Sequence, residues 1–286
     1  MICVTGAGGT VGSEVVTHLQ SAGVPFRAAY FSAEKADAAR AKGIDSVVIN
    51  YNRPETMRAA FQGCDKLFLL APNVLDQARL ELNAVEAAKA AGVRHIVKLS
   101  VWQADREEFE IARSHRMVEK AIESSGLAWT FLRPNSFMQN IGNYMAETVR
   151  TQGAFYSAAE KGKIGHVDVR DIAAVAVKAL TEPGHEGKTY SLTGPEALSY
   201  DELADELSKV LSRRVSHVNL PPADLKQGML AHGMPEGLVE RLLDLDRYYR
   251  EDRANSTTDD IKRVTGREPR PFAEYARESA PLLRSD

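Results

Sequence analysis

Residues 2–12 read Ile-Cys-Val-Thr-Gly-Ala-Gly-Gly-Thr-Val-Gly, and this stretch decides the fold. A short apolar strand runs straight into glycines, and a helical pattern follows. Glycine lets the backbone turn tightly and approach a phosphate closely, while the N–H groups and positive dipole of the next helix attract the anion. The stretch therefore predicts a turn that binds the pyrophosphate of a dinucleotide. The expected contact residues are Thr5, Gly6, Gly8, Gly9, Thr10, Val11 and Gly12.

The surroundings of this turn are those that a dinucleotide-binding motif requires. The helical pattern places Val15, Val16 and Leu19 on one face, stops at an Ala-Gly pair, and leads into an expected second strand over residues 26–30. The glycine spacing is Gly-x-x-Gly-x-x-Gly, not the Gly-x-Gly-x-x-Gly of most dehydrogenases, although Gly8 supplies an overlapping Gly-x-Gly start. The sequence thus contains a complete first βαβ unit.

The tip of the second strand bears on the choice of cofactor. Residues 30–35 read Tyr-Phe-Ser-Ala-Glu-Lys, with no acid at the strand tip. NAD enzymes usually place an Asp or Glu there, so its absence favours NADP(H), with NAD(H) as the other possibility. Ser32 and Lys35 are expected at the 2′-phosphate and Phe31 near the adenine. The alternative for Lys35 is a solvated residue in the first turn of the next helix.

Composition limits the classes of protein that remain. The chain has 286 residues and a formal net charge of −3, which fits a single α/β chain with a large core. It has no arginine-rich run for nucleic acid, no apolar stretch for a membrane span and no export leader, so we expect a cytoplasmic protein. Cys3 and Cys64 are expected to be buried thiols, and no Cys/His cluster predicts a metal site.

Short apolar strands alternate with helical stretches, which predicts an α/β fold with a doubly wound parallel sheet. Further strands are expected over residues 46–50, 66–71, 95–100, 128–133 and 189–192, and helices over residues 54–62, 75–91 and 113–125. Ligands bind at the carboxyl ends of such strands. Residues that end or follow these strands are therefore expected at the cofactor cleft: Asn50, Ala71, Pro72, Ser100, Trp102, Asn135 and Phe137.

Segments spread along the chain carry a family resemblance. They are Val-Thr-Gly-Ala-Gly-Gly-Thr-Val-Gly (4–12), Ala-Lys-Ala-Ala-Gly-Val-Arg-His-Ile-Val (88–97), Leu-Ala-Trp-Thr-Phe-Leu-Arg-Pro-Asn-Ser-Phe-Met-Gln-Asn (127–140), Val-Asp-Val-Arg-Asp-Ile-Ala (167–173) and Gly-His-Glu-Gly-Lys-Thr-Tyr (184–190). Together they resemble the NmrA-like family of atypical short-chain dehydrogenases, and most of all its bacterial flavin-free azoreductases, triphenylmethane dye reductases and NADPH quinone reductases. Residues 192–199 and 233–236 resemble the azoreductase branch.

The resemblance implies a Rossmann core over residues 1–155 and a mixed region over residues 156–286. The second region would contribute to the sheet and form a small, mostly helical lid over the substrate, in one continuous unit with the core. It also implies an NAD(P)H-dependent reductase that passes hydride to a planar or conjugated acceptor, such as a quinone or azo compound, without flavin or metal. We expect a monomer or homodimer without nucleic-acid or membrane partners.

The helix expected around residue 115 lacks the usual alcohol-dehydrogenase pair. Ile111 stands at the position of the tyrosine and His115 at that of the lysine; the reductases that the chain resembles also have His there, with a Glu matching Glu119. Hydride transfer to an electron-poor acceptor needs mainly proximity to the nicotinamide, so a built-in acid is not required. His115 is expected at the nicotinamide ribose or as a proton source. The alternative is a surface histidine paired with Glu119.

The resemblance places Asn135, Phe137 and Met138 beside the nicotinamide; core packing is the alternative for Phe137 and Met138. Asn135 and Phe137 are accordingly candidates, with His115, for the catalytic site. Trp102 is expected either as an aromatic wall or as a cap on its loop.

The region beyond residue 196 is predicted to be mostly helical. Helices are expected over residues 200–211, 225–230, 238–245, 257–264 and 271–280, the first starting at Ser199. Met229, Met234, Tyr248 and Tyr249 are candidates for lining the acceptor pocket, with ordinary packing as the alternative. The charge-rich run over residues 244–253 is expected to be a solvated helix or a lid.

A second class of function remains open, because a glycine turn predicts binding and not turnover. The namesake of the family binds dinucleotide yet regulates a transcription factor. The alternative function is therefore an NADP(H)-binding sensor without turnover. Epimerase-like or isoflavone-reductase-like activity is disfavoured, because the tyrosine of the former and the lysine of the latter are absent.

Overall fold

The computed structural model describes residues 1–284 and divides into two compact units that alternate along the chain. The first unit comprises residues 1–105, 113–133 and 169–190, and the second comprises residues 106–112, 134–168 and the chain from residue 191 onward. The strands are β1 (Ile2–Val4), β2 (Phe26–Tyr30), β3 (Ser46–Val48), β4 (Lys66–Leu69), β5 (His95–Leu99), β6 (Ala128–Pro134), β7 (Ala154–Ser157), β8 (Lys188–Leu192) and β9 (Ser216–Asn219).

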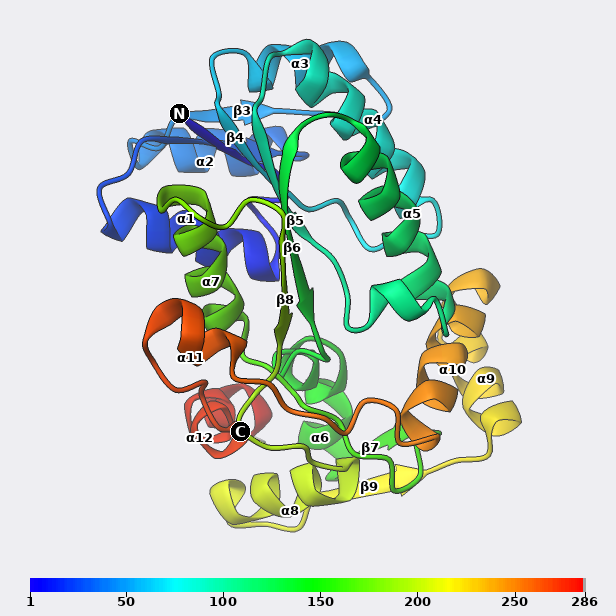
Figure 1. Cartoon of the computed structure of the whole chain (residues 1–286). Coiled ribbons are helices and arrows are strands. Elements are labelled where there is room, and N and C mark those ends of the chain that lie inside the picture. Colours follow the sequence, from blue (N-terminus) through cyan, green and yellow to red (C-terminus); the bar gives the residue numbers. More distant parts are fainter. Residues whose placement is uncertain (285–286) are drawn as a thin grey trace. The chain divides into compact units, whose positions relative to one another are not determined.

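Helices occupy most of the remaining chain (Figure 1). They are α1 (Thr10–Ser21), α2 (Ala33–Ala41), α3 (Pro54–Phe61), α4 (Gln77–Ala90), α5 (Glu110–Ser124), α6 (Ala146–Gln152), α7 (Val169–Thr181), α8 (Tyr200–Leu211), α9 (Pro222–Ala231), α10 (Glu236–Arg250), α11 (Asp260–Thr265) and α12 (Phe272–Leu283), with a 3-10 turn η1 (Ala104–Arg106) and a π-helical turn η2 (Ile141–Met145).

The main sheet has seven strands in the order β3-β2-β1-β4-β5-β6-β8. The pairings from β3 through β6 are parallel. The chain runs outward from β1 to β3 and then returns to place β4 on the other side of β1. The predicted Rossmann fold is confirmed, and its topological switch point, where nucleotides bind in such sheets, lies between β1 and β4.

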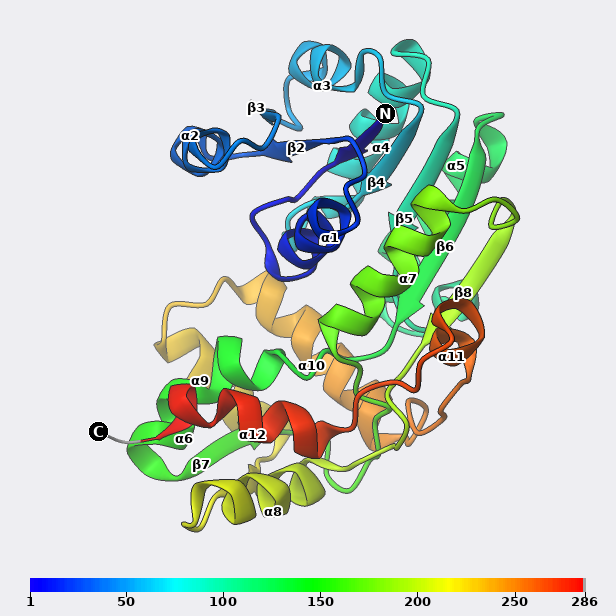
Figure 2. The same cartoon turned by 90° about the vertical axis from the view of Figure 1, so that its left-hand side faces the viewer.

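Helices cover both faces of this sheet. Helix α1 packs against α7 and α3 packs against α4, and Figures 1 and 2 show α1 and α7 on the face opposite to α3, α4 and α5. Apolar residues of the strands and helices on the second of these faces form a buried core. Its members include Cys3, Met57, Phe61, Leu67, Ile96, Val118, Ile122 and Phe131.

The second unit contains a small parallel sheet of β7 and β9 with its own helices. Helix α8 packs against β9 and α12, and α9 packs against α10. Ser199 begins α8 as expected: its hydroxyl accepts from the Glu202 backbone N–H, while the Glu202 carboxylate accepts from the Ser199 N–H. This capping box satisfies two backbone donors that a helix start leaves without intrahelical partners.

Some predicted boundaries were wrong. Strands β3, β4 and β5 end at Val48, Leu69 and Leu99, so Asn50, Ala71 and Ser100 follow the strands and do not belong to them. Helix α5 starts at Glu110, three residues earlier than expected. Strands β7 and β9 and helix α7 were not predicted. The domain division expected at residue 155 stays a prediction.

The charge-rich run over residues 244–253 is not a uniformly solvated helix. Tyr248 and Tyr249 are buried within it, and the ring of Tyr248 lies 4.5 Å from that of Phe109. For these two tyrosines the structure therefore favours the packing alternative. Met229 and Met234 are half-buried.

Candidate functional site

The glycine turn after β1 has the geometry of an anion-binding loop. Gly6 has φ +62°, a left-handed conformation that favours glycine, and a Cβ at residue 12 would lie 2.0 Å from the Gly6 carbonyl oxygen. The Gly9 N–H donates to that same oxygen at 2.9 Å, and Gly9 is the N-cap of α1, which begins at Thr10. The turn therefore brings the start of α1, with its outward N–H groups and positive dipole, to the carboxyl end of β1.

Thr5 has a structural use in this turn. Its buried hydroxyl lies 3.0 Å from the carbonyl oxygens of both Phe68 and Leu70, and it accepts from the Leu70 N–H at 2.9 Å. These bonds tie the end of β1 to the end of β4 at the switch point. Beyond Leu70, Ala71 is buried and Pro72 is exposed.

The tip of β2 reaches the glycine turn. Ser32 is the N-cap of α2, its hydroxyl accepting from the Lys35 N–H at 3.3 Å, and the Lys35 ammonium donates to the Gly8 carbonyl at 3.3 Å. The Phe31 ring is 70% exposed. Lys35 is exposed, as the solvated alternative expects, yet its charge lies directly at the glycine turn. Asn50 accepts from the Asn52 N–H at 2.9 Å and closes a local turn after β3.

His115 is buried and belongs to a polar cluster that the sequence did not predict. The Lys98 ammonium on β5 donates to His115 Nδ1 at 3.0 Å and forms an ion pair with Glu81 of α4 at 2.6 Å. Lys98 and Glu81 are both fully buried. One signal was present: a lysine stands inside the otherwise apolar end of the strand Ile-Val-Lys-Leu. Charged residues are almost never buried unless they are paired.

Glu119 lies in a second cluster one helical turn further along α5. Ser100 donates to Glu119 Oε1 at 2.6 Å, and Arg133 of β6 binds the carboxylate through two nitrogens at 3.0 and 2.7 Å. Burial alone would raise the pKa of Glu119, but the bonds from Arg133 and Ser100 outweigh it and lower the pKa. Together with a further ion pair to Arg116, these bonds give both oxygens of the Glu119 carboxylate a partner.

Asn135, Phe137 and Met138 lie in the second unit. The Asn135 amide is buried, donates to the Ala254 carbonyl at 3.0 Å and accepts from the Ser136 N–H at 2.9 Å. Met138 is buried, whereas Phe137 is half-buried beside its bridge partner Val167. The geometry gives Asn135 a structural use and favours packing for Met138. Trp102, in the first unit, is buried, and its indole N–H has no hydrogen-bond partner within residues 1–284.

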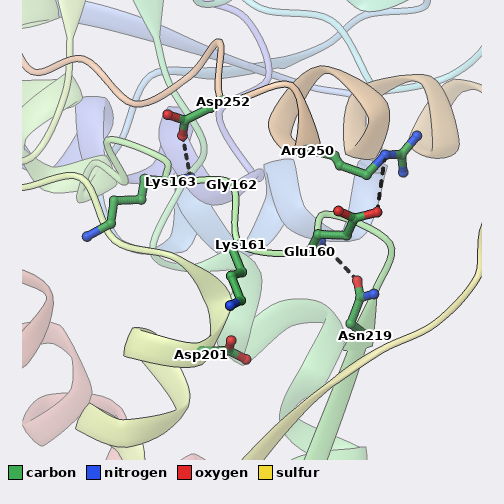
Figure 3. Close-up of a pocket in the computed structure, with 8 residues that line it drawn as sticks. All are labelled: Glu160, Lys161, Gly162, Lys163, Asp201, Asn219, Arg250 and Asp252. Atoms are coloured by element: carbon green, nitrogen blue, oxygen red, sulfur yellow. Dashed lines mark hydrogen bonds and ion pairs between the residues drawn. The ribbon is translucent and has the colours of Figure 1, made fainter.

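A charged surface pocket of about 650 Å³ lies within the second unit (Figure 3). Lys161, Lys163 and Arg250 oppose acidic side chains there, and Arg250 lies 3.7 Å from Glu160. Sites for planar organic ligands are predominantly apolar. This pocket is therefore a poor match to the expected acceptor, and none of the predicted site residues lines it. Its lining is Glu160, Lys161, Gly162, Lys163, Asp201, Asn219, Arg250 and Asp252.

Ser157, His217 and Asp201 form a hydrogen-bonded chain near this pocket. Ser157 Oγ lies 2.8 Å from His217 Nε2, and His217 Nδ1 lies 2.8 Å from the Asp201 carboxylate. The order of groups is that of a hydrolytic triad. However, Ser157 is 3% exposed and its oxygen also accepts from the Ala159 N–H at 3.2 Å. The chain therefore joins β7, β9 and α8 and presents no accessible nucleophile.

The described part of the chain shows neither a metal-binding cluster nor a membrane-spanning helix. Within residues 1–284, no group of three or more His, Cys, Asp or Glu side chains is arranged to hold a metal ion. No helix in that described part of the chain is both long and apolar enough to cross a membrane. Cys3 and Cys64 are free and buried, as expected.

Comparisons with known proteins place the chain. The model of the NmrA-like family matches residues 1–276. The NAD(P)H azoreductase of Xenophilus azovorans is 41% identical over 281 residues, which cover 98% of each chain. The NADPH complex of the quinone oxidoreductase QOR2 of Escherichia coli superposes with a TM-score of 0.89 at 32% identity, over 97% of this chain and 99% of the other.

A third relative is the triphenylmethane reductase of Citrobacter sp. complexed with NADP(H). It superposes with a TM-score of 0.85 at 30% identity, over 98% of this chain and 99% of the other. The matches confirm the predicted resemblance and the predicted class of enzyme, an NAD(P)H-dependent reductase. The chain belongs to the NmrA-like family.

Proposed function

We propose that this protein transfers hydride from NADPH, in preference to NADH, to a conjugated acceptor such as a quinone or azo compound, without flavin or metal. The observation that carries the proposal is the glycine turn, where Gly6 and Gly12 approach each other too closely for any side chain and Lys35 adds a positive charge at Gly8. The names of the relatives, an azoreductase and a quinone oxidoreductase, support the acceptor class.

The preference for NADPH rests on the tip of β2. No acid stands at residues 31–33 to bind and orient the ribose hydroxyls of NAD, and an acid there would also repel a 2′-phosphate. The Ser32 hydroxyl accepts from the Lys35 N–H and keeps its own proton to donate. With the Lys35 ammonium, it supplies two groups suited to a phosphate, and the exposed Phe31 ring can stack on the adenine.

The chemistry of the acceptor explains why no tyrosine is needed. The bound cofactor supplies a hydride from its nicotinamide ring. The acceptor gains that hydride and one proton, and a quinone stabilises the intermediate anion itself, so the proton can come from water. The part left to this chain is to bind and orient the two reactants, with His115 donating a hydrogen bond at the nicotinamide end. Phe137 contributes an apolar surface to the acceptor, and Asn135 supports the segment that carries it.

The proposal is tested with purified, flavin-free protein by following the absorbance band of reduced nicotinamide. NADPH and NADH are supplied in turn with a panel of quinones and azo dyes. The proposal predicts oxidation that requires the acceptor and is faster with NADPH. Tight binding of NADPH without turnover across the panel would instead favour the NADP(H)-binding sensor.

A further inference from the structure

The Lys98 ammonium group has one acceptor for each of its three hydrogens. A lysine ammonium has three donor hydrogens and no acceptor. The acceptors around Lys98 Nζ are Glu81 Oε2 at 2.6 Å, the Leu99 carbonyl at 3.0 Å and His115 Nδ1 at 3.0 Å. Since Lys98 is fully buried, water does not compete for these bonds.

The charge state of Lys98 follows from Glu81. Glu81 is fully buried, and its other oxygen accepts from Gln77 Nε2 at 3.4 Å. A carboxylate in direct contact with an amine favours the charged form of that amine. A neutral Lys98 would offer two hydrogens and would have to accept one from His115, while leaving the Glu81 carboxylate buried without a counter-ion. The ammonium form satisfies all of these groups at once.

The tautomer of His115 follows from Lys98. When an ammonium donates to Nδ1, that nitrogen must be an acceptor, so a neutral His115 carries its proton on Nε2. Protonation of Nδ1 would break the bond from Lys98 and place two cations in contact. Glu81 and Glu119 do not offset this, because Glu81 is already paired with Lys98 and Glu119 is paired with Arg133 and Arg116.

The spacing of residues along β5 and α5 determines where the two clusters lie. Lys98 and Ser100 are two residues apart on one face of the chain at the end of β5, a rise of about 6.6 Å. His115 and Glu119 are four residues apart on one face of α5, a rise of about 6 Å. The matching spacings let each strand residue meet one helix residue, Lys98 with His115 and Ser100 with Glu119.

We propose that Lys98 is a positioning residue that holds His115 neutral with its proton on Nε2, so that His115 serves the reductase as a fixed hydrogen-bond donor and not as an acid. The inference rests on the proposed function, which places His115 at the nicotinamide. Of the two roles considered for His115, a contact to the ribose or a proton source, it selects the contact. A donor on Nε2 recognises an oxygen, such as a ribose hydroxyl or the carbonyl of a quinone.

The test is the ¹⁵N spectrum of the full-length protein with ¹⁵N-labelled histidine, recorded from pH 5.5 to pH 8. The His115 signals are assigned by their loss in His115→Gln. Wild type is expected to show an unprotonated Nδ1 and a protonated Nε2 throughout. Lys98→Met removes the donor to Nδ1 and is expected to let His115 take up a second proton within this pH range. Lys66→Met, a change on the neighbouring strand β4, is the matched control and should leave the His115 signals unchanged.

Two results would overturn the inference. A doubly protonated His115 near pH 6 in wild type, or a proton on Nδ1, would show that Lys98 does not set the tautomer, while acceptor-dependent oxidation of NADPH would still stand. The wild-type spectrum decides this even if Lys98→Met fails to fold. The expected tautomer together with unchanged kinetics in His115→Gln would remove His115 from the reaction.

A kinetic readout separates positioning from stability. In wild type, kcat/KM for NADPH and a quinone should show no transition from His115 between pH 6 and pH 8. In Lys98→Met, a new transition should appear in this pH profile because His115 then gains and loses a proton. A uniform loss of activity at every pH, with no new transition, would show that Lys98 only stabilises the fold.

Discussion

At the scale of single residues, the candidate site depends on positions where an added methyl group or a lost charge should change how the cofactor is bound. Gly12 has no room for a side chain, because a Cβ there would lie 2.0 Å from the Gly6 carbonyl oxygen. Lys35 and Lys98 are both cations near predicted site residues, but Lys35 is exposed at the glycine turn and Lys98 is buried against His115.

Gly12→Ala should disrupt the turn. The added methyl group must push α1 away from the Gly6 carbonyl, at a cost of about 1–3 kcal/mol in unfolding free energy. We expect a lower Tm and weaker binding of NADPH, measured by thermal denaturation and calorimetric titration. Gly228→Ala is the control, since a Cβ there meets nothing within 4 Å and helix α9 should gain slightly in stability. Equal NADPH affinity in Gly12→Ala and wild type would place the pyrophosphate elsewhere.

Lys35→Ala should reduce the preference for NADPH. An exposed ion pair contributes about 1 kcal/mol, which corresponds to roughly a fivefold rise in KM for NADPH with little change in KM for NADH. Steady-state kinetics with both cofactors provide the measurement. Lys42→Ala, at the other end of helix α2, removes the same charge and should change neither constant. If both cofactors lose affinity equally, Lys35 does not contact the 2′-phosphate.

His166 should make the protein sensitive to acid. Burial lowers the pKa of His166 to about 3, against about 6.5 for an exposed histidine. The unfolded chain binds a proton at His166 below pH 6.5 and the folded chain does not, so stability is present above pH 6.5 and falls as the pH drops toward 3. The slope from this group is about 1.4 kcal/mol per pH unit. Chemical denaturation at pH 7 and pH 5 should show a smaller difference in His166→Asn; an unchanged difference would contradict this assignment.

At the scale of elements, the periodicity of apolar residues predicted the long and regular helices. Helix α8 spans the expected residues and begins at Ser199, because its apolar face and capping box agree. Helix α7 has the same helical spacing of apolar residues, at Val169, Ile172, Ala173 and Ala176, and could have been predicted. Strands β7 and β9 could not, because each has four residues and pairs only with the other, far away in the sequence.

Ser199→Ala should weaken helix α8. Loss of the hydroxyl leaves the Glu202 N–H without its acceptor and costs about 1 kcal/mol of unfolding free energy. Ser124→Ala, at an exposed position of α5 whose hydroxyl binds only within its own turn, is the comparison and should be nearly neutral. Thermal denaturation of both variants checks the difference; equal Tm values would show that the capping box does not stabilise α8.

At the scale of the whole molecule, the sequence predicted the doubly wound parallel sheet and the glycine turn after its first strand. The cluster of Glu81, Lys98 and His115 was missed because it joins three elements: the lysine inside the apolar strand signals a buried charge but does not identify its partners. For Asn135 the sequence predicts a role in the site, and the structure shows its amide bonded to the backbone of Ala254. Such contacts between distant segments depend on tertiary packing.

Under the proposed function, this chain itself transfers hydride from NADPH to an acceptor. In the most direct measurement, flavin-free protein preloaded with NADPH is mixed under anaerobic conditions with a smaller, known amount of a quinone. We predict that the reduced-nicotinamide absorbance falls in proportion to the quinone consumed, and that added flavin does not change the rate. Bound NADPH that keeps its absorbance in the presence of the quinone, or that loses it only when flavin is added, would contradict the account.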